Sequence, residues 1–289
     1  MNSHRRLDTN APGPLYVTSA CIDCDTCRQL APTVFTEAKG FSTVARQPET
    51  GVEWKQALHA LLACPTAAIV SEEKGDIAKA MADFPLLLED GVYYCGYTSP
   101  KSFGGSSYFI VRSNGNWLVD APRFVPSLVR RFEEMGGIDT IFLTHRDDVA
   151  DAKLYAERFG AKRIIHAFER AAQPDAEHVI EGFEDVRWDN EMKIVVVPGH
   201  TRGSMVLLYR ERFLFTGDHL AWDRHRGTLE AFDDYCWYSW EEQGLSMEQL
   251  AAETFEWVLP GHGERVKLPP ADMKKAIQRL VEEMRDGSP

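Results

Sequence analysis

An apolar run that ends in a histidine and two aspartates reads Ile141-Phe-Leu-Thr-His145-Arg-Asp147-Asp148-Val-Ala-Asp151. Three later segments have the same order, an apolar run followed at once by residues that bind metals. They read Val196-Val-Pro-Gly-His200-Thr-Arg-Gly-Ser204, Leu214-Phe-Thr-Gly-Asp218-His219 and Val258-Leu-Pro-Gly-His262-Gly. Short apolar runs are typical of buried strands, and the loops that follow such strands gather at one edge of a sheet. Because imidazoles and carboxylates bind zinc, iron and manganese, the pattern predicts a metal site at that edge.

The residues around these segments, from 92 to 289, predict a layered α/β domain. Apolar runs that indicate strands lie at 108–111, 117–119, 138–143, 163–166, 193–197, 205–209 and 213–215. Helical patterns lie at 124–135, 149–159, 246–255 and 271–285. Hairpins early in the domain and alternating strands and helices later are typical of sheets covered by helices.

Residues 92–289 resemble the metallo-β-lactamase fold superfamily, and within it their sequence pattern is similar to that of the glyoxalase II-like branch. Two segments of this chain are similar to the opening hairpins of that family, namely Ser102-Phe-Gly-Gly-Ser-Ser-Tyr-Phe-Ile and Leu118-Val-Asp120. Three others are similar to its later metal motifs, namely Pro198-Gly-His200-Thr, Thr216-Gly-Asp218 and Pro260-Gly-His262. The resemblance implies an αββα sandwich with metals at one edge. It also implies a small-molecule substrate, such as a thioester or another small ester.

The first motif departs from the family pattern His-x-His-x-Asp-His, and two alignments are open. Without a gap, His145 is the first histidine, Asp147 replaces the second, and Val149 and Ala150 remove most of the second metal site. With a two-residue deletion, Asp147 becomes the motif aspartate and Asp148 replaces the last histidine.

The ungapped alignment places His145, Asp147, His200 and Asp218 around one metal, with His262 nearby. This set resembles the first iron site of flavodiiron proteins, which also has a carboxylate at the second position. We expect one or two Fe, Zn or Mn ions, and the additional carboxylate favours iron or manganese over zinc. The predicted catalytic groups are Asp218, which holds one metal or bridges two, and Asp147 or Asp148, whichever is free to take a proton.

A separate cysteine cluster reads Cys21-Ile-Asp-Cys24-Asp-Thr-Cys27, and Cys64-Pro65 follows later in the chain. Three cysteines at this spacing hold three corners of an iron–sulfur cube, and the fourth corner comes from a distant residue. Zinc is the alternative, although zinc sites usually take cysteines in two separated pairs. Over residues 15–72 the pattern resembles single-cluster ferredoxins. This resemblance implies one 4Fe-4S cluster bound by Cys21, Cys24, Cys27 and Cys64.

Composition limits the remaining possibilities. We expect a flexible tail at 1–14, a ferredoxin-like domain at 15–72, a linker at 73–91 and the metallo-β-lactamase-like domain at 92–289. The net charge of −12 among 289 residues argues against nucleic-acid binding and is compatible with a basic redox partner protein. The chain contains no apolar run of the roughly 20 residues that span a membrane, so we expect a cytoplasmic protein. The oligomeric state is left open.

Three functions are consistent with these observations. The first is a metal-dependent hydrolase, in which the metal lowers the pKa of bound water. The second is a redox enzyme that passes electrons from the cluster to non-haem iron, which would explain why the two domains are joined. The third is a non-enzymatic electron carrier or cluster sensor built on a hydrolase fold that has lost its activity.

Overall fold

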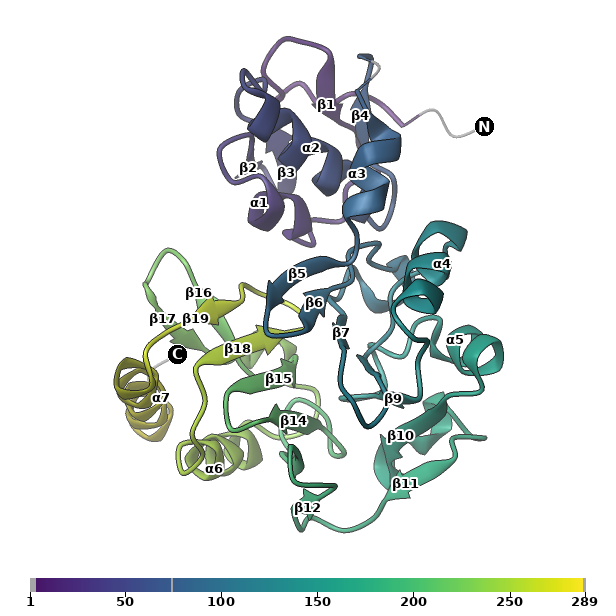
Figure 1. The fold of residues 1–289 in the computed structure, drawn as a ribbon. Helices are drawn as coiled ribbons and strands as arrows, with labels where there is room; N and C mark the ends of the chain where they lie inside the picture. The colour runs from purple at the N-terminus through teal and green to yellow at the C-terminus, as the bar shows by residue number, and fades with distance from the viewer. Residues whose placement is uncertain (1–3, 74, 288–289) are drawn as a thin grey trace.

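The computed structural model describes residues 4–73 and 75–287, and it contains a small N-terminal domain above a larger one (Figure 1). In the small domain, β1 (Leu15–Val17) pairs with β4 (Ile69–Ser71), and β2 (Phe35–Ala38) forms a hairpin with β3 (Phe41–Val44). Two helices, α1 (Thr26–Leu30) and α2 (Gly51–Ala63), complete it. The helix α2 begins with a capping box, in which Thr50 and Glu53 bond each other's backbone N–H groups.

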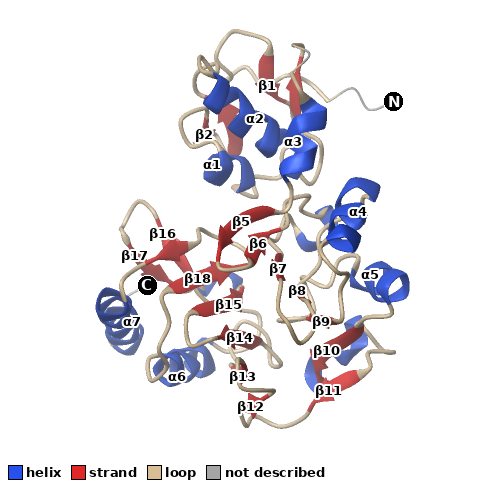
Figure 2. Ribbon diagram, viewed as in Figure 1, coloured by secondary structure: helices blue, strands red, loops and turns tan. Residues whose placement is uncertain are grey.

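The larger domain is built on two sheets that pack face to face (Figure 2). The first sheet has seven strands in the order β11-β10-β9-β8-β7-β6-β5. Its strands are β5 (Leu86–Glu89), β6 (Val92–Tyr94), β7 (Tyr108–Ile110), β8 (Trp117–Val119), β9 (Thr140–Phe142), β10 (Lys162–His166) and β11 (His178–Ile180). The second sheet has six strands in the order β12-β13-β14-β15-β18-β19. Its strands are β12 (Val186–Arg187), β13 (Met192–Val196), β14 (Met205–Tyr209), β15 (Phe213–Gly217), β18 (Trp257–Pro260) and β19 (Val266–Lys267).

Helices cover the outer face of each sheet. The helices α4 (Pro126–Glu134) and α5 (Ala152–Phe159) lie on the first sheet, and α6 (Trp240–Leu250) and α7 (Pro270–Arg285) lie on the second. One core, with Phe109, Phe142 and Phe213, fills the space between the sheets, and a second core, with Leu214 and Met247, lies under α6 and α7. The predicted αββα sandwich is therefore confirmed. None of the described helices is long and apolar enough to cross a membrane.

Three of the four predicted metal motifs follow parallel strands of the second sheet. The strands β13, β15 and β18 run in the same direction, because each of the first two is antiparallel to β14 and β15 is parallel to β18. Their carboxyl ends therefore carry His200, Asp218 and His262 to one edge. The fourth motif, with His145, follows β9 of the first sheet.

The structure differs from the sequence prediction at both boundaries of the small domain. Residues 1–3 of the expected flexible tail lie outside the described residues, but Leu7 and Asn10 are bonded to Val17 of β1, so residues 4–14 form part of this domain. The expected linker at 73–91 contains helix α3 (Ile77–Asp83) and the edge strand β5. The three consecutive leucines of β5 lie on a strand that pairs with β6, and they therefore belong to the first sheet.

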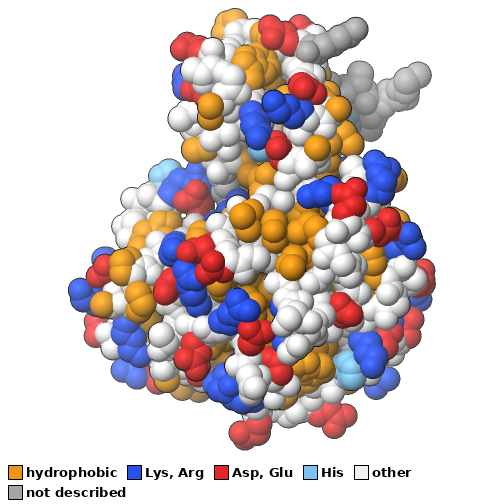
Figure 3. Space-filling view, viewed as in Figure 1, with side chains coloured by type: hydrophobic (Ala, Val, Ile, Leu, Met, Phe, Trp, Pro, Cys, Tyr) orange, Lys and Arg blue, Asp and Glu red, His pale blue; other side chains and the backbone are white. Residues whose placement is uncertain are grey.

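Two further features were not predicted. The helix expected at 246–255 begins earlier, because the side chain of Ser239 caps it by accepting a hydrogen bond from Glu242 N–H. Apolar side chains also gather where the two domains meet, around β5 (Figure 3). Leu87 of this strand is 61% exposed.

Candidate iron–sulfur and metal centres

The four cysteines predicted to bind the cluster line one cavity of about 300 Å³, together with apolar residues such as Val17 and Ile69. Cys21 and Cys24 lie on the loop that leads into α1, Cys27 lies in the first turn of α1, and Cys64 lies at the C-terminal end of α2. All four are free thiols. Four convergent thiols in an apolar cavity fit a 4Fe-4S cluster.

Two backbone N–H groups lie close to sulfur atoms of these cysteines, and burial surrounds the thiols with apolar atoms. Asp23 N–H lies 3.4 Å from Cys21 Sγ, and Ala68 N–H lies 3.3 Å from Cys64 Sγ. Burial raises the pKa of the Cys24 thiol to about 11 and also raises the pKa of Cys27. Buried thiolates are costly unless a cation neutralises them, so the cavity is suited to a bound metal cluster.

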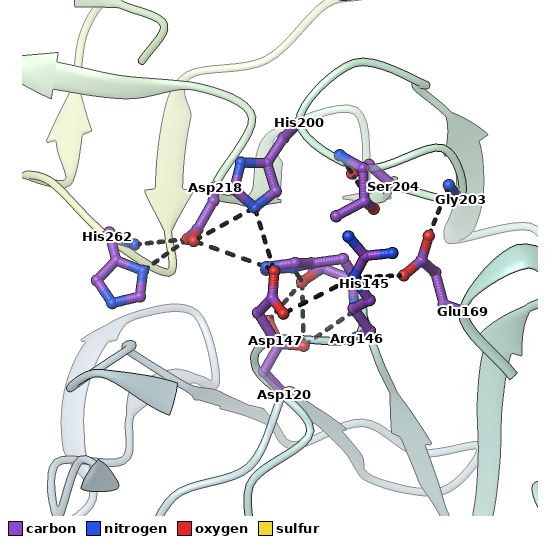
Figure 4. Close-up of polar contacts among 12 residues, drawn as sticks. Asp120, His145, Arg146, Asp147, Glu169, His200, Gly203, Ser204, Asp218 and His262 are labelled. Atoms are coloured by element: carbon purple, nitrogen blue, oxygen red, sulfur yellow. Dashed lines mark hydrogen bonds and ion pairs between the residues drawn. The ribbon is translucent and has the colours of Figure 1, made fainter. Parts of the chain in front are cut away.

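Four side chains surround one point at the edge of the large domain (Figure 4). His145 Nε2 lies 3.8 Å from Asp147 Oδ2 and 3.6 Å from Asp218 Oδ2. His200 Nε2 lies 3.7 Å and 3.8 Å from the same two oxygens. Ligand atoms about 2.0–2.2 Å from a metal stand about 3.4 Å apart in a tetrahedron, so these four contacts are close to the spacing of metal ligands. His145, Asp147 and His200 form one compact group that could hold an ion.

Asp148 faces a second position beside this point. Both of its carboxylate oxygens are buried without a hydrogen-bond partner, and one of them forms a compact group with His145 and Asp218. His262 lies on the far side of Asp218, and its Nε2 is also buried without a partner. Asp147 therefore lies beside His145 and His200, and Asp148 lies beside His145 and Asp218. Under either alignment of the first motif, a carboxylate faces each of the two positions.

Several polar atoms of this pocket are buried without a hydrogen-bond partner, and this supports metal binding. His145 Nε2 and His200 Nε2 are buried without a hydrogen-bond partner, in addition to the atoms of Asp148 and His262. Buried polar atoms are nearly always paired in native proteins, by protein, water or a ligand. Two compact groups of imidazole and carboxylate atoms lie side by side here, one formed by His145, Asp147 and His200 and the other by His145, Asp148 and Asp218. Such donors suit a divalent cation.

The pKa values of the pocket residues in the metal-free protein also indicate that the pocket favours positive charge. Burial opposes ionisation of His145, but its contacts with Asp218 raise its pKa to about 9. Burial and then the charge of Asp218 raise the pKa of Asp148 to about 7. Burial opposes ionisation of Asp218, but the nearby His262 and His145 hold the pKa of this carboxylate well below its usual value. The histidines thus hold protons that a bound metal would displace.

The orientation of His145 comes from residues that the metal motifs did not identify. Its Nδ1 lies 3.0 Å from Thr144 Oγ1, and this hydroxyl lies 3.0 Å from Asp120 Oδ2. Asp120 also accepts a hydrogen bond from Thr144 N–H. Such a chain directs Nε2 of His145 into the pocket and fixes its tautomer. The sequence signal was the threonine directly before the histidine.

A second supporting group lies beside Asp147. Glu169 is buried, accepts a hydrogen bond from Gly203 N–H and lies 3.8 Å from Arg146 Nε (Figure 4). Arg146 Nε also lies 3.8 Å from Asp147 Oδ1. Nothing in the sequence around Glu169 indicated this role.

Aromatic side chains border the pocket on two sides. The ring of Trp237 lies 6.3 Å from that of His200, and the ring of Phe103 lies 6.4 Å from that of His262. Both aromatic side chains are more than half exposed. His219, the residue after Asp218, is completely buried, and burial and then the charge of His200 lower its pKa to about 3.

Comparisons with known proteins agree with this division of the chain. A family described as the 4Fe-4S single cluster domain of ferredoxin I matches residues 17–71. The structure resembles the DIM-1 metallo-β-lactamase, with a TM-score of 0.52 and 16% identity over 68% of this chain and 94% of that one. It resembles a metallo-β-lactamase from Hirschia baltica, with a TM-score of 0.51 and 15% identity over 68% and 96% of the two chains. For ETHE1 from Myxococcus xanthus the TM-score is 0.50, with 18% identity over 68% and 87%.

A comparison with curated protein sequences gives no match. At identities this low, the structural likeness establishes the fold and leaves the reaction open. The chain therefore joins an N-terminal single-cluster 4Fe-4S domain of the ferredoxin type to a C-terminal domain with the metallo-β-lactamase fold.

Proposed function

We propose that the protein is an oxidoreductase in which a 4Fe-4S cluster exchanges single electrons with a non-haem iron or manganese ion. The ion is held by His145, Asp147, His200 and Asp218. The observation that carries this proposal is the presence of equal numbers of imidazole nitrogens and carboxylate oxygens. Each of the two Nε2 atoms lies 3.6–3.8 Å from the Oδ2 atoms of Asp147 and Asp218. Such mixed sets suit iron and manganese, whereas catalytic zinc more often has an additional nitrogen or sulfur ligand.

The attached cluster domain supports the same proposal. Hydrolysis transfers no electrons, so it gives the cluster no electron-transfer role. A metal that changes oxidation state needs an electron supply, and a single-cluster domain carries one electron at a time. When bound, the 4Fe-4S cluster and the metal ion would together supply one-electron chemistry at the pocket.

The residues of the pocket have separate parts in this function. Asp218 accepts hydrogen bonds from His262 on one side and faces the two imidazoles on the other. Thr144 and Asp120 hold the ring of His145 in place. Asp148 is buried, and neither of its carboxylate oxygens has a hydrogen-bond partner among the described residues, so it is free to accept a proton from a group bound in the pocket.

The test is a comparison of metal content and electron transfer in the full chain purified without oxygen. We expect iron or manganese in the C-terminal site, reduced by dithionite through the cluster. In a Cys21→Ser, Cys64→Ser double variant the C-terminal metal should remain but be reduced much more slowly. If zinc alone fills the site of the wild-type protein, the redox function is wrong. If no metal binds there, the domain is a scaffold and the cluster acts as a carrier or sensor.

A second candidate is a metal-dependent hydrolase of a small ester or thioester. Asp148 favours it, because a buried carboxyl group beside a metal could serve as a general base for bound water. The two candidates differ in their need for the cluster. Thioester hydrolysis by the zinc-loaded cysteine double variant, at the rate of the intact protein, would favour the hydrolase.

A further inference from the structure

The contacts between the two domains are concentrated at the cluster. Thr98 donates two hydrogen bonds to the carbonyl of Ala63, and Arg123 donates to the carbonyl of Cys64. Gln29 donates to the carbonyl of Gly263 at 2.9 Å. Among the described residues, every hydrogen bond from residues 4–73 to residues 92–287 involves a position within two residues of a cysteine that lines the cavity.

Two consecutive glycines separate the cluster cavity from the metal pocket. A Cβ atom at Gly104 would lie 2.6 Å from Cβ and 2.9 Å from Sγ of Cys24. A Cβ atom at Gly105 would lie 2.6 Å from Oδ1 of Asp148. Neither position has room for a side chain, so the backbone of these two residues is the whole partition between Cys24 and Asp148.

These contacts limit the distance between the two centres. Adjacent Cα atoms across a trans peptide are about 3.8 Å apart, so Sγ of Cys24 lies no more than about 12 Å from Oδ1 of Asp148. Electrons tunnel through protein over distances of this size without an additional carrier. Gly104 and Gly105 are both buried, and Ser106 N–H donates at 2.7 Å to the carbonyl of Gly261, which holds this loop against the metal motif.

An ion pair holds the cluster loop against this partition. Arg224, on the hairpin of β16 (Ala221–Asp223) and β17 (Thr228–Glu230), donates to Asp25 at 2.7 Å. It also lies 2.8 Å from Glu264, two residues after His262. Arg224 thereby links the residue after Cys24 to the loop that carries His262. The pair is only about one quarter exposed on each side, so it is better shielded from solvent than a surface pair.

We propose that the Gly104–Gly105 backbone is the direct electron bridge between the cluster and the metal pocket, and that the Arg224–Asp25 pair holds the cluster loop against it. This inference rests on the proposed function. In the step, one electron leaves the reduced cluster, which becomes oxidised by one, and one ferric ion becomes ferrous. The electron that entered the cluster comes from an external one-electron donor, for which dithionite substitutes in the experiment.

The experiment measures this step in the full chain, without oxygen, with ferric iron in the C-terminal site. Less than one equivalent of dithionite reduces the cluster, and its reoxidation is followed by visible absorbance while the ferric signal is followed by electron paramagnetic resonance. The variants are Arg224→Met, which removes the ion pair, and Gly105→Ala, which pushes on Asp148. Their matched controls are Arg226→Met, whose side chain bonds Glu283, and Gly244→Ala, where a Cβ meets no atom within 4 Å.

We expect electron transfer in Arg224→Met and Gly105→Ala to be slower than in the wild type, because the rate of electron tunnelling falls steeply as the gap between the two centres widens. Cluster content and cluster reduction potential should stay at the wild-type values in Arg224→Met. A slower rate would then come from the position of the cluster and not from a changed driving force for electron transfer. Both controls should transfer at the wild-type rate.

The two possible failures are distinguishable. If the wild-type cluster is reduced and no electron reaches the ferric ion, the proposed function is wrong and the bridge with it. If the wild type transfers electrons and Arg224→Met does so at the same rate, the bridge is wrong and the proposed function stands. Should Gly105→Ala fail to fold, Arg224→Met alone decides the result.

Discussion

Asp218 and His262 are joined by two hydrogen bonds to one carboxylate oxygen. Oδ1 of Asp218 lies 3.1 Å from the backbone nitrogen of His262 and 2.8 Å from its Nδ1. The other oxygen, Oδ2, is thereby turned toward His145 and His200. Asp218 thus stands between the first metal position and the group formed by Asp148 and His262, where one carboxylate can serve both.

Replacing Asp218 should abolish metal binding. In Asp218→Asn, one charged ligand is lost and the contact with His262 is weakened. We expect metal affinity to fall by more than about a hundredfold, since even outer partners of ligands contribute about 10–100-fold. Metal titration and elemental analysis measure this. Asp234→Asn, an exposed aspartate outside the pocket, is the matched control and should bind metal normally. Normal metal content in Asp218→Asn would show that Asp218 is not a ligand.

Removing the hydroxyl of Thr144 should weaken the metal site without touching a ligand. In Thr144→Val, Nδ1 of His145 and the buried carboxylate of Asp120 lose their shared partner. We expect about 10–100-fold weaker metal binding and a metal-free protein destabilised by about 1–3 kcal/mol. Thr144→Ser keeps the hydroxyl and should restore most of the affinity, which separates orientation from packing. Equal affinities in the two variants would contradict this role.

Cys64 should be required for the cluster although it is distant in sequence from the other three cysteines. In Cys64→Ser, the cavity keeps its shape but offers only three thiolates, so we expect loss of the 4Fe-4S spectrum and of about one iron or more per chain. Iron analysis and electron paramagnetic resonance of the reduced protein provide the measurement. Cys236→Ser, outside the cavity, should keep a full cluster. A stable four-iron cluster in Cys64→Ser would mean that another residue is the fourth ligand.

The metal-free protein should lose stability as the pH rises. Contacts with Asp218 raise the pKa values of His145 and His262 against the opposing effect of burial, to about 9 and about 10, from an unfolded value of 6.5. The folded state therefore binds more protons than the unfolded state, and the stabilisation present below 6.5 is lost as the pH rises through these values. Asp148, whose pKa burial raises to about 7, acts in the same direction at lower pH.

Urea unfolding of the metal-free protein across this pH range measures the effect. His262→Gln should show a shallower decline than the wild type, and His225→Gln, on an exposed turn, should show the same decline. Added metal should reverse the trend, because it binds deprotonated ligands and displaces protons. A metal-free protein whose stability is constant over this range would show that the histidines are not protonated in the folded state.

The sequence by itself determined which residues carry the chemistry and where each lies along its strand. His200, Asp218 and His262 each follow an apolar run, and such a run predicts a buried strand from local residues alone. The spacing of Cys21, Cys24 and Cys27 is likewise local, since one loop must wrap three corners of a cube. For these residues the prediction needed no knowledge of how distant parts of the chain pack.

The tertiary structure alone decided what each aspartate of the first motif faces and how the two centres meet. The loop after β9 turns so that Asp147 faces His200 while Asp148 faces Asp218, and this path depends on packing against Gly105 and Gly261 from distant segments. The approach of Cys24 to Gly104 likewise arises from the docking of one domain on the other. Contacts of this kind depend on the summed packing of many residues, and no local pattern encodes them.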